Sequence, residues 1–262
     1  MSPSASLSPD PDDREFAKTL AKGLEVLAAF DRETPGMTIS EVATRFGFNR
    51  AVARRIVRTL EILGYLKQER RVYSLTPRVL RLGFGYLASN KVGNVIHPIL
   101  KQVTAEIDEP CSMGVLDGNE VVYVAHSPGE QRHFSVGLTV GSRLPLLTTA
   151  TGRALLSRLP EDHAKSLIQD APLQQETPKT EMNRDRLALL IAEARQQGHA
   201  YAEDEVEIGL ASVAVPVVSA AGALIGAINV VVNNGRVDES TLRGDYANSL
   251  KRCAAHLAAA LG

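Results

Sequence analysis

Three arginines recur at helical spacing in the first third of the chain: Arg50, Arg54 and Arg58. At about 100° per residue these positions share one face of an α-helix, with Arg55 on the flank of that face. A second face of the same helix is apolar and can pack on the protein: Val52, Ile56, Leu60 and Leu63. A guanidinium is planar and can donate two hydrogen bonds to a guanine edge or to a phosphate. On an isolated helix, however, such spacing is more often a solvated basic face.

The segments around the arginines favour DNA binding over a merely solvated face. Ser40 is placed to cap a short helix, Asn49 to cap the basic helix, and Gly64 to end it. A basic tip with Arg70 and Arg71 then joins two short extended segments. The expected elements are helices over residues 15–30, 41–46 and 50–63 and strands over residues 65–68 and 72–75. This order is typical of a winged helix-turn-helix, which binds double-stranded DNA.

We therefore predict a DNA-binding domain over residues 14–76. The N-terminal part of the basic helix would enter the major groove, and the wing would meet the phosphate backbone. The predicted DNA contacts are Thr38, Ser40, Asn49, Arg50, Ala51, Arg54, Arg55, Arg58, Arg70 and Arg71.

A second group of polar residues lies in the rear half of the chain, where a loop leads into a helix expected over residues 151–158. Thr148, Thr149 and Thr151 cluster at that point. The free N–H groups at a helix start attract a carboxylate. Simple N-capping would explain one of the three threonines but not all of them. We predict a ligand site formed by Arg143, Leu144, Leu146, Thr148, Thr149, Ala150, Thr151 and Gly152.

The length and composition suit two folded domains without a membrane segment. The chain has 262 residues, and 44% of them are hydrophobic, which is ample for two cores. Residues 1–13 are rich in Ser, Pro and Asp, so we expect a disordered leader and not a signal peptide. The two cysteines, Cys111 and Cys253, lie far apart. Neither a disulfide framework nor a thiolate zinc site is expected, and the cytoplasm is the predicted compartment.

The net charge of −1 by itself argues against nucleic acid, but its distribution does not. Lys and Arg outnumber Asp and Glu by about two to one over residues 14–90, whereas residues 91–262 are net acidic. A basic front and an acidic rear indicate a polyanion-binding module attached to another domain.

Between the two parts we expect a linker helix over residues 77–90. Its apolar residues face more than one side: Val79, Leu80, Leu82, Phe84, Tyr86 and Leu87. One interpretation is a packed core helix, and the other is a helix whose second apolar side meets another subunit. We favour the second and predict a dimer.

The remaining residues, 91–262, alternate strand and helix patterns and predict an α+β ligand-binding domain. Strands are expected over residues 111–116, 121–125, 134–136, 211–218 and 223–232, and helices over residues 95–107, 151–158, 162–169, 184–197 and 239–261.

Enzyme chemistry finds little support in the sequence. There is no P-loop, HExxH or GxSxG motif. The acidic run of residues 203–207 could bind a metal ion, but we expect a solvated loop there. No cofactor or metal is predicted. Two alternatives stay open: a ligand-binding enzyme whose helical front domain serves assembly, and a purely architectural DNA binder.

Five segments together resemble the IclR family of bacterial transcription regulators, over nearly the whole chain after the leader. In the front half they are TLAKGLEVLAAF (residues 19–30), TISEVATRFGFNRAVARRIVRTLEILGYL (38–66) and YSLTPRVLRLG (73–83). In the rear half they are VGSRLPLLTTATGRALLS (140–157) and GHAYAEDEVEIGLASVAVPVVSAAGALIGAINV (198–230). NRAVARR, TPRVLRLG and VGSRLP further resemble the branch that controls aromatic-acid breakdown through the β-ketoadipate pathway. Ala211 departs from that branch, which often has arginine there.

The resemblance implies a GAF-like effector domain over residues 91–262 and a dimer that can pair again into a tetramer. It also implies operator binding that responds to a small organic acid, either an aromatic acid or a β-ketoadipate-like diacid. It places Ser212 and Asn229 on strands that form the floor of the ligand site.

Overall fold

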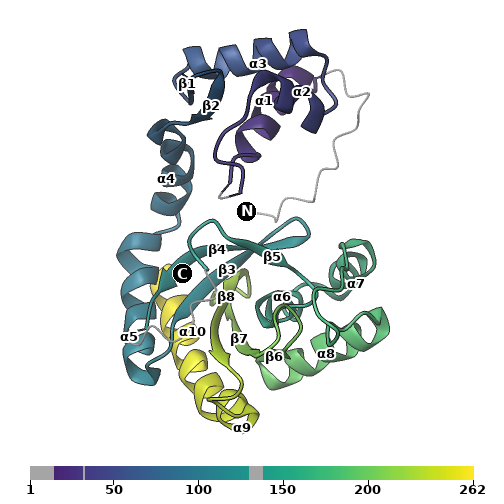
Figure 1. Cartoon of the computed structure of the whole chain (residues 1–262). Coiled ribbons are helices and arrows are strands. Elements are labelled where there is room, and N and C mark those ends of the chain that lie inside the picture. The colour runs from purple at the N-terminus through teal and green to yellow at the C-terminus, as the bar shows by residue number, and fades with distance from the viewer. Residues whose placement is uncertain (1–14, 32, 130–137) are drawn as a thin grey trace. The chain divides into compact units, whose positions relative to one another are not determined.

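The computed structural model describes residues 15–31, 33–129 and 138–262 (Figure 1). The chain divides into two compact units, Met1–Tyr86 and Leu87–Gly262. This division falls inside the segment expected to be the linker. The expected leader and the expected strand over residues 134–136 lie outside the described residues.

The first unit is a three-helix fold followed by a β-hairpin, as predicted. Its elements are α1 (Lys18–Ala28), α2 (Ile39–Arg45), α3 (Arg50–Ile62), β1 (Leu66–Glu69) and β2 (Val72–Leu75). Antiparallel pairing joins β1 to β2, and a single bridge joins Met37 to Tyr73. Val26, Val42 and Val57 are fully buried at the centre of its core. The winged helix-turn-helix is therefore confirmed.

The caps of two helices follow local rules, one of them differently from the prediction. Asn49 caps α3 by accepting a hydrogen bond from the backbone N–H of Val52 at 2.9 Å. Thr38, not Ser40, caps α2, because its hydroxyl accepts from the N–H of Glu41 while that carboxylate accepts from the N–H of Thr38. This reciprocal capping box satisfies two N–H groups at once, and Ser40 lies one residue inside the helix as an exposed side chain.

The linker segment begins with a 3-10 turn, η1 (Pro77–Val79), and continues as α4 (Leu80–Ser89). All residues of α4 are described, and none is buried within the single chain. Leu80 and Phe84 are 71% and 70% exposed. A packed core helix is therefore excluded for this segment within one chain.

The second unit is built on a six-stranded antiparallel sheet of order β5-β4-β3-β8-β7-β6. Its strands are β3 (Cys111–Asp117), β4 (Glu120–Ser127), β5 (Arg143–Pro145), β6 (Ala200–Glu203), β7 (Leu210–Val218) and β8 (Leu224–Asn233). Its helices are η2 (Val92–Ile96), α5 (His97–Ile107), α6 (Ala150–Leu156), α7 (Glu161–Asp170), α8 (Arg184–Gln197), α9 (Glu239–Thr241), η3 (Leu242–Tyr246) and α10 (Ala247–Leu261). The α+β prediction is confirmed.

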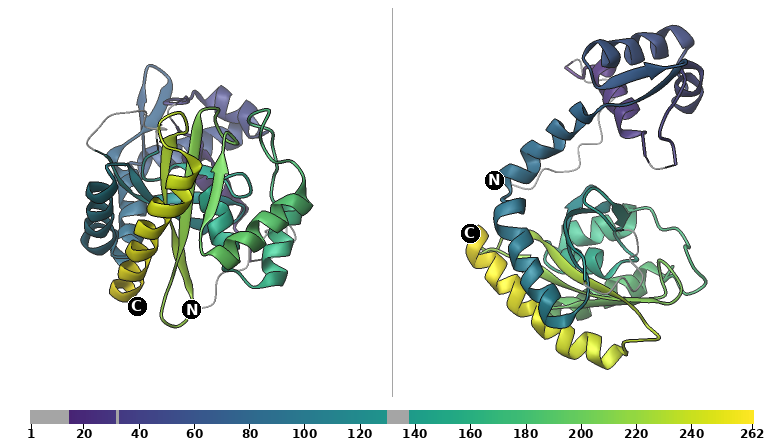
Figure 2. Two further views of the ribbon diagram at one scale, coloured as in Figure 1. Left: turned by 90° about the horizontal axis from the view of Figure 1, so that it is seen from below. Right: turned by 60° about the vertical axis from the view of Figure 1, so that its left-hand side comes forward.

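Helices cover both faces of this sheet and create two separate cores (Figures 1 and 2). α5 and α10 pack on one face around Leu100, Val213 and Leu250. α6, α7 and α8 pack on the other around Leu155 and Leu187. The single helix expected over residues 239–261 is divided by the π-helical turn η3. No helix within the described ranges is long and apolar enough to cross a membrane.

Candidate DNA-binding surface and ligand pocket

Helix α3 presents its arginines to solvent and its apolar face to the core of the first unit. Arg50, Arg54, Arg55 and Arg58 are all exposed, as is Ala51. The buried positions are Ala53, Ile56, Val57 and Leu60, so the apolar face is shifted from the one expected, and Leu63 is 49% exposed. The arginine face remains exposed to solvent along the whole helix.

Arg58 forms a 2.6 Å ion pair with Glu61 on the same helix, and the arginine side chain remains 63% exposed. Such exposed pairs contribute little to stability. A phosphate can therefore replace Glu61 as the partner of Arg58 at small cost.

The tip of the β1–β2 hairpin carries two arginines in an uncommon backbone conformation. Arg70 and Arg71 have φ angles of 49° and 75°, the left-handed values of the two central residues in a type I′ turn. Gly and Asn adopt these left-handed φ values more easily than residues with long or branched side chains do. Both arginine side chains are exposed, so the turn projects two positive charges into solvent.

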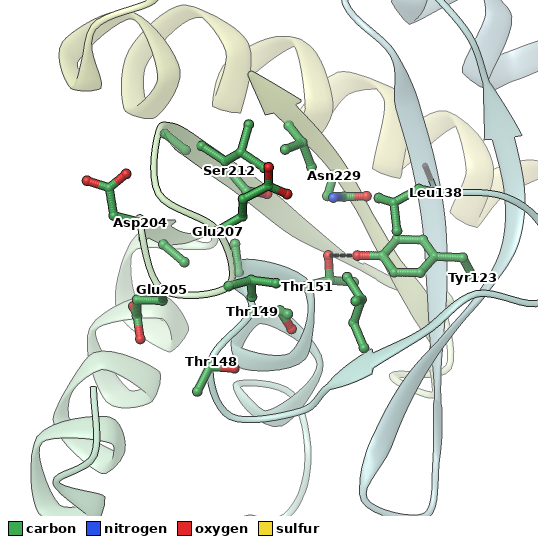
Figure 3. Close-up of a pocket in the computed structure, with 17 residues that line it drawn as sticks. Tyr123, Leu138, Thr148, Thr149, Thr151, Asp204, Glu205, Glu207, Ser212 and Asn229 are labelled. Atoms are coloured by element: carbon green, nitrogen blue, oxygen red, sulfur yellow. Dashed lines mark hydrogen bonds between the residues drawn. The ribbon is translucent and has the colours of Figure 1, made fainter. Parts of the chain in front are cut away.

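A pocket in the second unit lies where the start of α6 meets strands β4, β7 and β8 and the loop over residues 204–209 (Figure 3). The space free of protein atoms here is about 450 Å³, open solvent at the pocket mouth included. Leu138, Leu144, Leu210 and Val231 provide apolar walls. Its neutral polar side chains are Tyr123, Thr148, Thr149, Thr151, Ser212 and Asn229.

The three threonines have different roles. Thr149 is the N-cap of α6: its hydroxyl accepts from the N–H of Gly152 at 3.0 Å and donates to the carbonyl of Pro145 at 2.8 Å. Thr151 pairs with the Tyr123 hydroxyl at 3.0 Å. Thr148 is 1% exposed, and its Oγ1 has no partner among the described residues. Capping thus accounts for Thr149 only.

Tyr123 stays a neutral phenol in this environment. Burial raises the pKa of its hydroxyl to about 12, although hydrogen bonding with Thr151 and Asn229 acts against the rise. The Asn229 Oδ1 atom is buried and, within the described part of the chain, has no hydrogen-bond partner. The pocket therefore holds two unsatisfied buried oxygens, on Thr148 and on Asn229, which a bound molecule can satisfy.

Three of the residues predicted for the ligand site do not line the pocket. Arg143 lies on β5 and binds Glu120 at 2.6 Å and Asp117 at 2.7 Å, so two carboxylates already occupy its guanidinium. Leu146 is buried in the core behind the pocket. Gly152 packs so closely that a Cβ atom would lie 1.9 Å from the carbonyl oxygen of Leu146. The residues that do line it are Leu144, Thr148, Thr149, Ala150, Thr151, Ser212 and Asn229.

Ala211 contributes to the pocket lining, but it belongs to the core cluster on the α5 and α10 face of the sheet, with Val213 and Val215. Successive residues of a strand point to opposite faces. A larger side chain at position 211 would thus be directed away from the α6 side. The resembling branch often has arginine at this position. With the geometry seen here, the change to alanine therefore removes no positive charge from the pocket.

The acidic run of residues 203–207 is only in part the solvated loop that was expected: Glu207 is exposed, but two other carboxylates are buried. Asp204 and Glu205 are 3% and 8% exposed. Arg153, which is 1% exposed on α6, donates to both carboxylate oxygens of Glu205, at 2.6 Å and 2.7 Å. Arg153 also donates to the carbonyls of Leu147 and Tyr201. This ion pair joins the start of α6 to the loop that closes the pocket.

The segment that connects α7 to α8 also binds this loop through hydrogen bonds. The Thr177 hydroxyl donates to the carbonyl of Asp204 at 2.5 Å, and the Thr180 hydroxyl donates to that of Glu205 at 2.7 Å. Lys179 binds the Asp204 carboxylate at 2.6 Å and lowers the pKa of Asp204. No group of His, Cys, Asp and Glu among the described residues could hold a metal ion. The carboxylates instead fix the shape of the pocket.

A basic recognition helix with a basic wing, joined to a separate unit with a pocket lined by apolar and polar side chains, defines a DNA-binding transcription regulator. Comparison with known proteins identifies its relatives. The model of the IclR helix-turn-helix domain matches residues 19–70, and that of the bacterial transcriptional regulator IclR C-terminal domain matches residues 84–259. The chain belongs to the IclR family. It is a transcription regulator and not an enzyme.

Named relatives align along most of the chain. It is 35% identical over 241 residues to the Pca regulon regulatory protein of Pseudomonas putida, covering 92% of this chain and 83% of the relative. It is 35% identical over 232 residues to the p-hydroxybenzoate hydroxylase transcriptional activator of Acinetobacter baylyi, covering 87% and 86%. A transcriptional regulator from Rhodococcus sp. RHA1 has the same fold, with a TM-score of 0.81, 36% identity and coverage of 94% and 98%.

Proposed function

We propose that this regulator controls genes for the breakdown of aromatic compounds, and that a small carboxylate bound in the α6 pocket changes its action on operator DNA. The observation that carries the proposal is the pair of buried oxygens on Thr148 and Asn229, which have no hydrogen-bond partner among the described residues and belong to side chains that line one pocket. The names of relatives support the same class of ligand. One relative is an activator for p-hydroxybenzoate hydroxylase, and a double mutant of the inducer-binding domain of a 30% identical regulator from Acinetobacter was solved with 3-hydroxybenzoic acid.

Local donors, not long-range attraction, would hold the carboxylate. Because residues 91–262 are net acidic, their overall field repels an anion. No other described residue competes for the Thr148 hydroxyl, and the paired hydroxyls of Tyr123 and Thr151 can turn toward an anion. The first N–H groups of α6, on Ala150 and Thr151, add backbone donors. Each charge-assisted hydrogen bond contributes about 1.5–3 kcal/mol.

Titration calorimetry of the full-length protein tests this site with Thr148→Val. The substitution keeps the shape of the side chain and removes a hydroxyl that has no hydrogen-bond partner in the described part of the chain. We expect the affinity for the best-binding benzoate derivative to fall about tenfold or more. Thr104→Val is the control, because Thr104 is also buried, but on α5, which packs against the opposite face of the sheet.

The amide of the same acid should bind far more weakly than the acid itself. Equal binding of acid and amide would show that no charge is recognised. Equal affinity of folded Thr148→Val and wild type would place the carboxylate elsewhere in the protein.

We further propose that Arg50, Arg54 and Arg58 contact the operator unequally. The N-terminal end of a recognition helix usually reaches base edges, and later residues meet phosphates. Arg50 stands at the first position of α3, and Arg58 two turns later. The predicted contacts of Ala51 and Arg55 share this exposed helix, those of Thr38, Ser40 and Asn49 lie at the helix starts, and Arg70 and Arg71 form the wing.

A dimer, with pairing into a tetramer, completes the proposal. One recognition helix reads only half of a symmetric operator. The exposed apolar side chains of α4 offer a surface that a second copy can cover. Leu20 and Leu24 on α1, 63% and 53% exposed, add to the apolar surface of the first unit. Such a regulator would act in the bacterial cytoplasm, where its DNA lies.

A further inference from the structure

The first turn of the linker is bound to the end of the recognition helix α3. Thr76 is the last residue before η1, and its hydroxyl donates a hydrogen bond to the carbonyl of Gly64 at 2.6 Å. The same oxygen accepts from the N–H of Arg78 at 3.2 Å and so caps η1. A hydroxyl can donate one hydrogen bond and accept two, so both contacts form together. One side chain thus connects the residue that ends α3 to the residues that begin the linker.

The Arg78 side chain adds a second contact at the same place. Its guanidinium lies over the ring of Tyr65, with 5.6 Å between Cζ and the ring centre. A Cβ atom added to Gly64 would lie 3.0 Å from Nη1 of Arg78, and Gly64 has a φ of 78°. The left-handed conformation favours glycine at this position, and the absence of a side chain lets the arginine approach. Arg78 forms no ion pair with another described residue, so stacking on Tyr65 is what holds its guanidinium.

These contacts go beyond the pairing of the β1–β2 hairpin. The ladder joins Leu66 to Leu75 and is continued by one hydrogen bond, from the N–H of Thr76 to the carbonyl of Tyr65 at 2.9 Å. Closing the hairpin needs no more than these backbone bonds. The Thr76 hydroxyl and Arg78 instead fix the direction in which the chain leaves the hairpin, and Figure 1 shows α4 starting near the C-terminal end of α3.

The helix that starts from this contact also carries the surface offered to a second copy. Leu80 and Phe84, 71% and 70% exposed, lie on the part of α4 that belongs to the first unit. The two recognition helices of a dimer must lie one helical turn of DNA apart, about 34–36 Å, or a multiple of it. When two copies meet along α4, the angle between α4 and α3 sets that separation. The contacts of Thr76 and Arg78 hold this angle.

A small rotation at this point has a large effect at the DNA. α3 has 13 residues, and at 1.5 Å per residue its first residue, Arg50, lies about 20 Å from the Gly64 end. A rotation of about 10° about that end moves Arg50 by about 3.4 Å, which is the rise of one base pair. A loosened contact would therefore let each recognition helix slip by a full base pair.

Resting on the proposed dimer, we propose that Thr76 and Arg78 are positioning residues that set the spacing between operator half-sites accepted by this regulator. In this role they need not touch DNA or ligand. They hold α3 at a fixed angle to the linker, so that both recognition helices of a dimer meet the major groove in register. A variant that loses these contacts should still bind each half-site but tolerate an altered spacing between them.

Mobility-shift titrations of the full-length protein with altered operators test the proposal. The operator is located by footprinting in the DNA upstream of its own gene, and one base pair is then inserted or removed between the half-sites. For the wild type, we expect this change to lower the affinity at least about tenfold. For Arg78→Met, which keeps the length of the side chain but not the guanidinium, the same change should lower it less than about threefold. The affinity of this variant for the unaltered spacing should fall by about three- to tenfold, because pre-organisation is lost.

Arg81→Met is the matched control. Arg81 is an exposed arginine on α4, and no ion pair or ring contact joins it to another described residue, so this variant should keep the wild-type preference. Salt dependence separates positioning from direct contact with DNA. Loss of a phosphate contact lowers the salt slope by about one, whereas Arg78→Met should leave the slope unchanged. Thr76→Val removes only the bridging hydroxyl and should relax the spacing preference in the same direction.

Three results would overturn the inference: Arg78→Met with the wild-type spacing preference, a salt slope lowered by about one in that variant, or a wild type that binds all spacings equally. Sedimentation distinguishes this failure from failure of the proposed dimer. A dimer that gives any of these results removes the inference alone, whereas a monomer with full operator affinity removes the dimer as well. If Thr76→Val does not fold, Arg78→Met still decides, because Arg78 is exposed.

Discussion

Replacing Arg153 by methionine should be the most damaging single change near the pocket. The arginine side chain is 2% exposed and that of Glu205 is 9% exposed. Methionine has a similar length but no charge, so Glu205 would remain as a buried carboxylate without its partner. Breaking a buried ion pair in this way costs about 3–5 kcal/mol.

The carbonyls of Leu147 and Tyr201 also lose a donor in Arg153→Met. Each buried carbonyl left unsatisfied adds about 1–3 kcal/mol, unless water enters. Arg195→Met is the matched control. Arg195, which is exposed, donates to the carbonyls of Ser157 and Leu159, at 2.9 Å and 2.7 Å, but forms no ion pair among the described residues. The difference between the two variants contains the effect of the unpaired charge together with that of the deeper burial of Arg153, and we expect it to be about 3 kcal/mol or more.

The assay is urea unfolding of the full-length protein, followed by far-ultraviolet circular dichroism. The transition of the second unit is the one that moves to higher urea when the bound carboxylate is added. Free energies are compared only where the slope with urea is unchanged. If Arg153→Met costs no more than Arg195→Met, the ion pair does not hold the pocket together.

A double-mutant cycle provides a second check. In Arg153→Met combined with Glu205→Gln, no buried charge is left unpaired. The double variant should therefore be more stable than the sum of the two single effects predicts, by about 2 kcal/mol. Strict additivity would show that the two side chains are not coupled.

Four further predictions concern other parts of the molecule. Gly152→Ala should abolish ligand binding and destabilise the second unit by several kcal/mol, because its Cβ atom would lie 1.9 Å from the Leu146 carbonyl oxygen; a stable variant with normal binding would contradict this packing. The pKa of Asp204 is lowered from 3.8, chiefly by Lys179, so the stability that Asp204 contributes is complete above about pH 5 and is lost as the pH falls through the lowered folded-state pKa. The stability difference between wild type and Asp204→Asn should accordingly shrink between pH 5 and pH 3, and a constant difference in urea titrations would refute this. Single alanine substitutions of Arg50, Arg54 and Arg58 should divide into base contacts, which cost about 1–3 kcal/mol and relax specificity, and phosphate contacts, which lower the salt slope by about one; a folded triple variant with normal operator affinity would exclude α3 as the recognition helix. Sedimentation should show a dimer or tetramer at micromolar concentration, and Leu80→Glu with Phe84→Glu should shift it toward monomer; a wild-type monomer with full operator affinity would exclude the dimer.

Local rules explain why the front of the molecule could be predicted in detail. A cap, a helix face and a hairpin turn depend on residues a few positions apart, so the sequence around Asn49 is sufficient to start α3. The cap of α2 was misplaced even though the sequence contained the answer. Thr38 and Glu41 stand three apart, which is the spacing of a capping box, whereas Ser40 lacks a Glu or Gln three residues later.

Tertiary partners explain why the pocket was predicted only in part. The threonines at the start of α6 were visible as a local cluster, but the role of each depends on distant residues. Thr151 meets Tyr123, which is 28 positions away. The residues of the acidic run were expected in solvent because nothing nearby balances them, and Arg153 lies 52 positions before Glu205. The sequence contained one signal of this ion pair. Arg153 lies within the apolar stretch of α6, and an arginine buried there needs an acidic partner.

The edge strands were missed for a related reason. β5 has three residues and β6 has four, too few for an alternating pattern to stand out from a loop. Arg143 was consequently placed at the ligand site, whereas its position on β5 brings it to Asp117 and Glu120.

The central claim is that a small carboxylate in the α6 pocket alters how this regulator binds DNA, and a mobility-shift titration tests it most directly. The full-length protein is titrated onto the DNA upstream of its own gene, with and without saturating hydroxybenzoate. We predict that the acid changes the apparent Kd at least about fivefold, as coupling of 1–3 kcal/mol requires. The same shift in Thr148→Val should need about tenfold more acid, with DNA affinity in its absence unchanged. A Kd that is the same with and without the acid, at concentrations where calorimetry shows the pocket to be filled, would contradict the account.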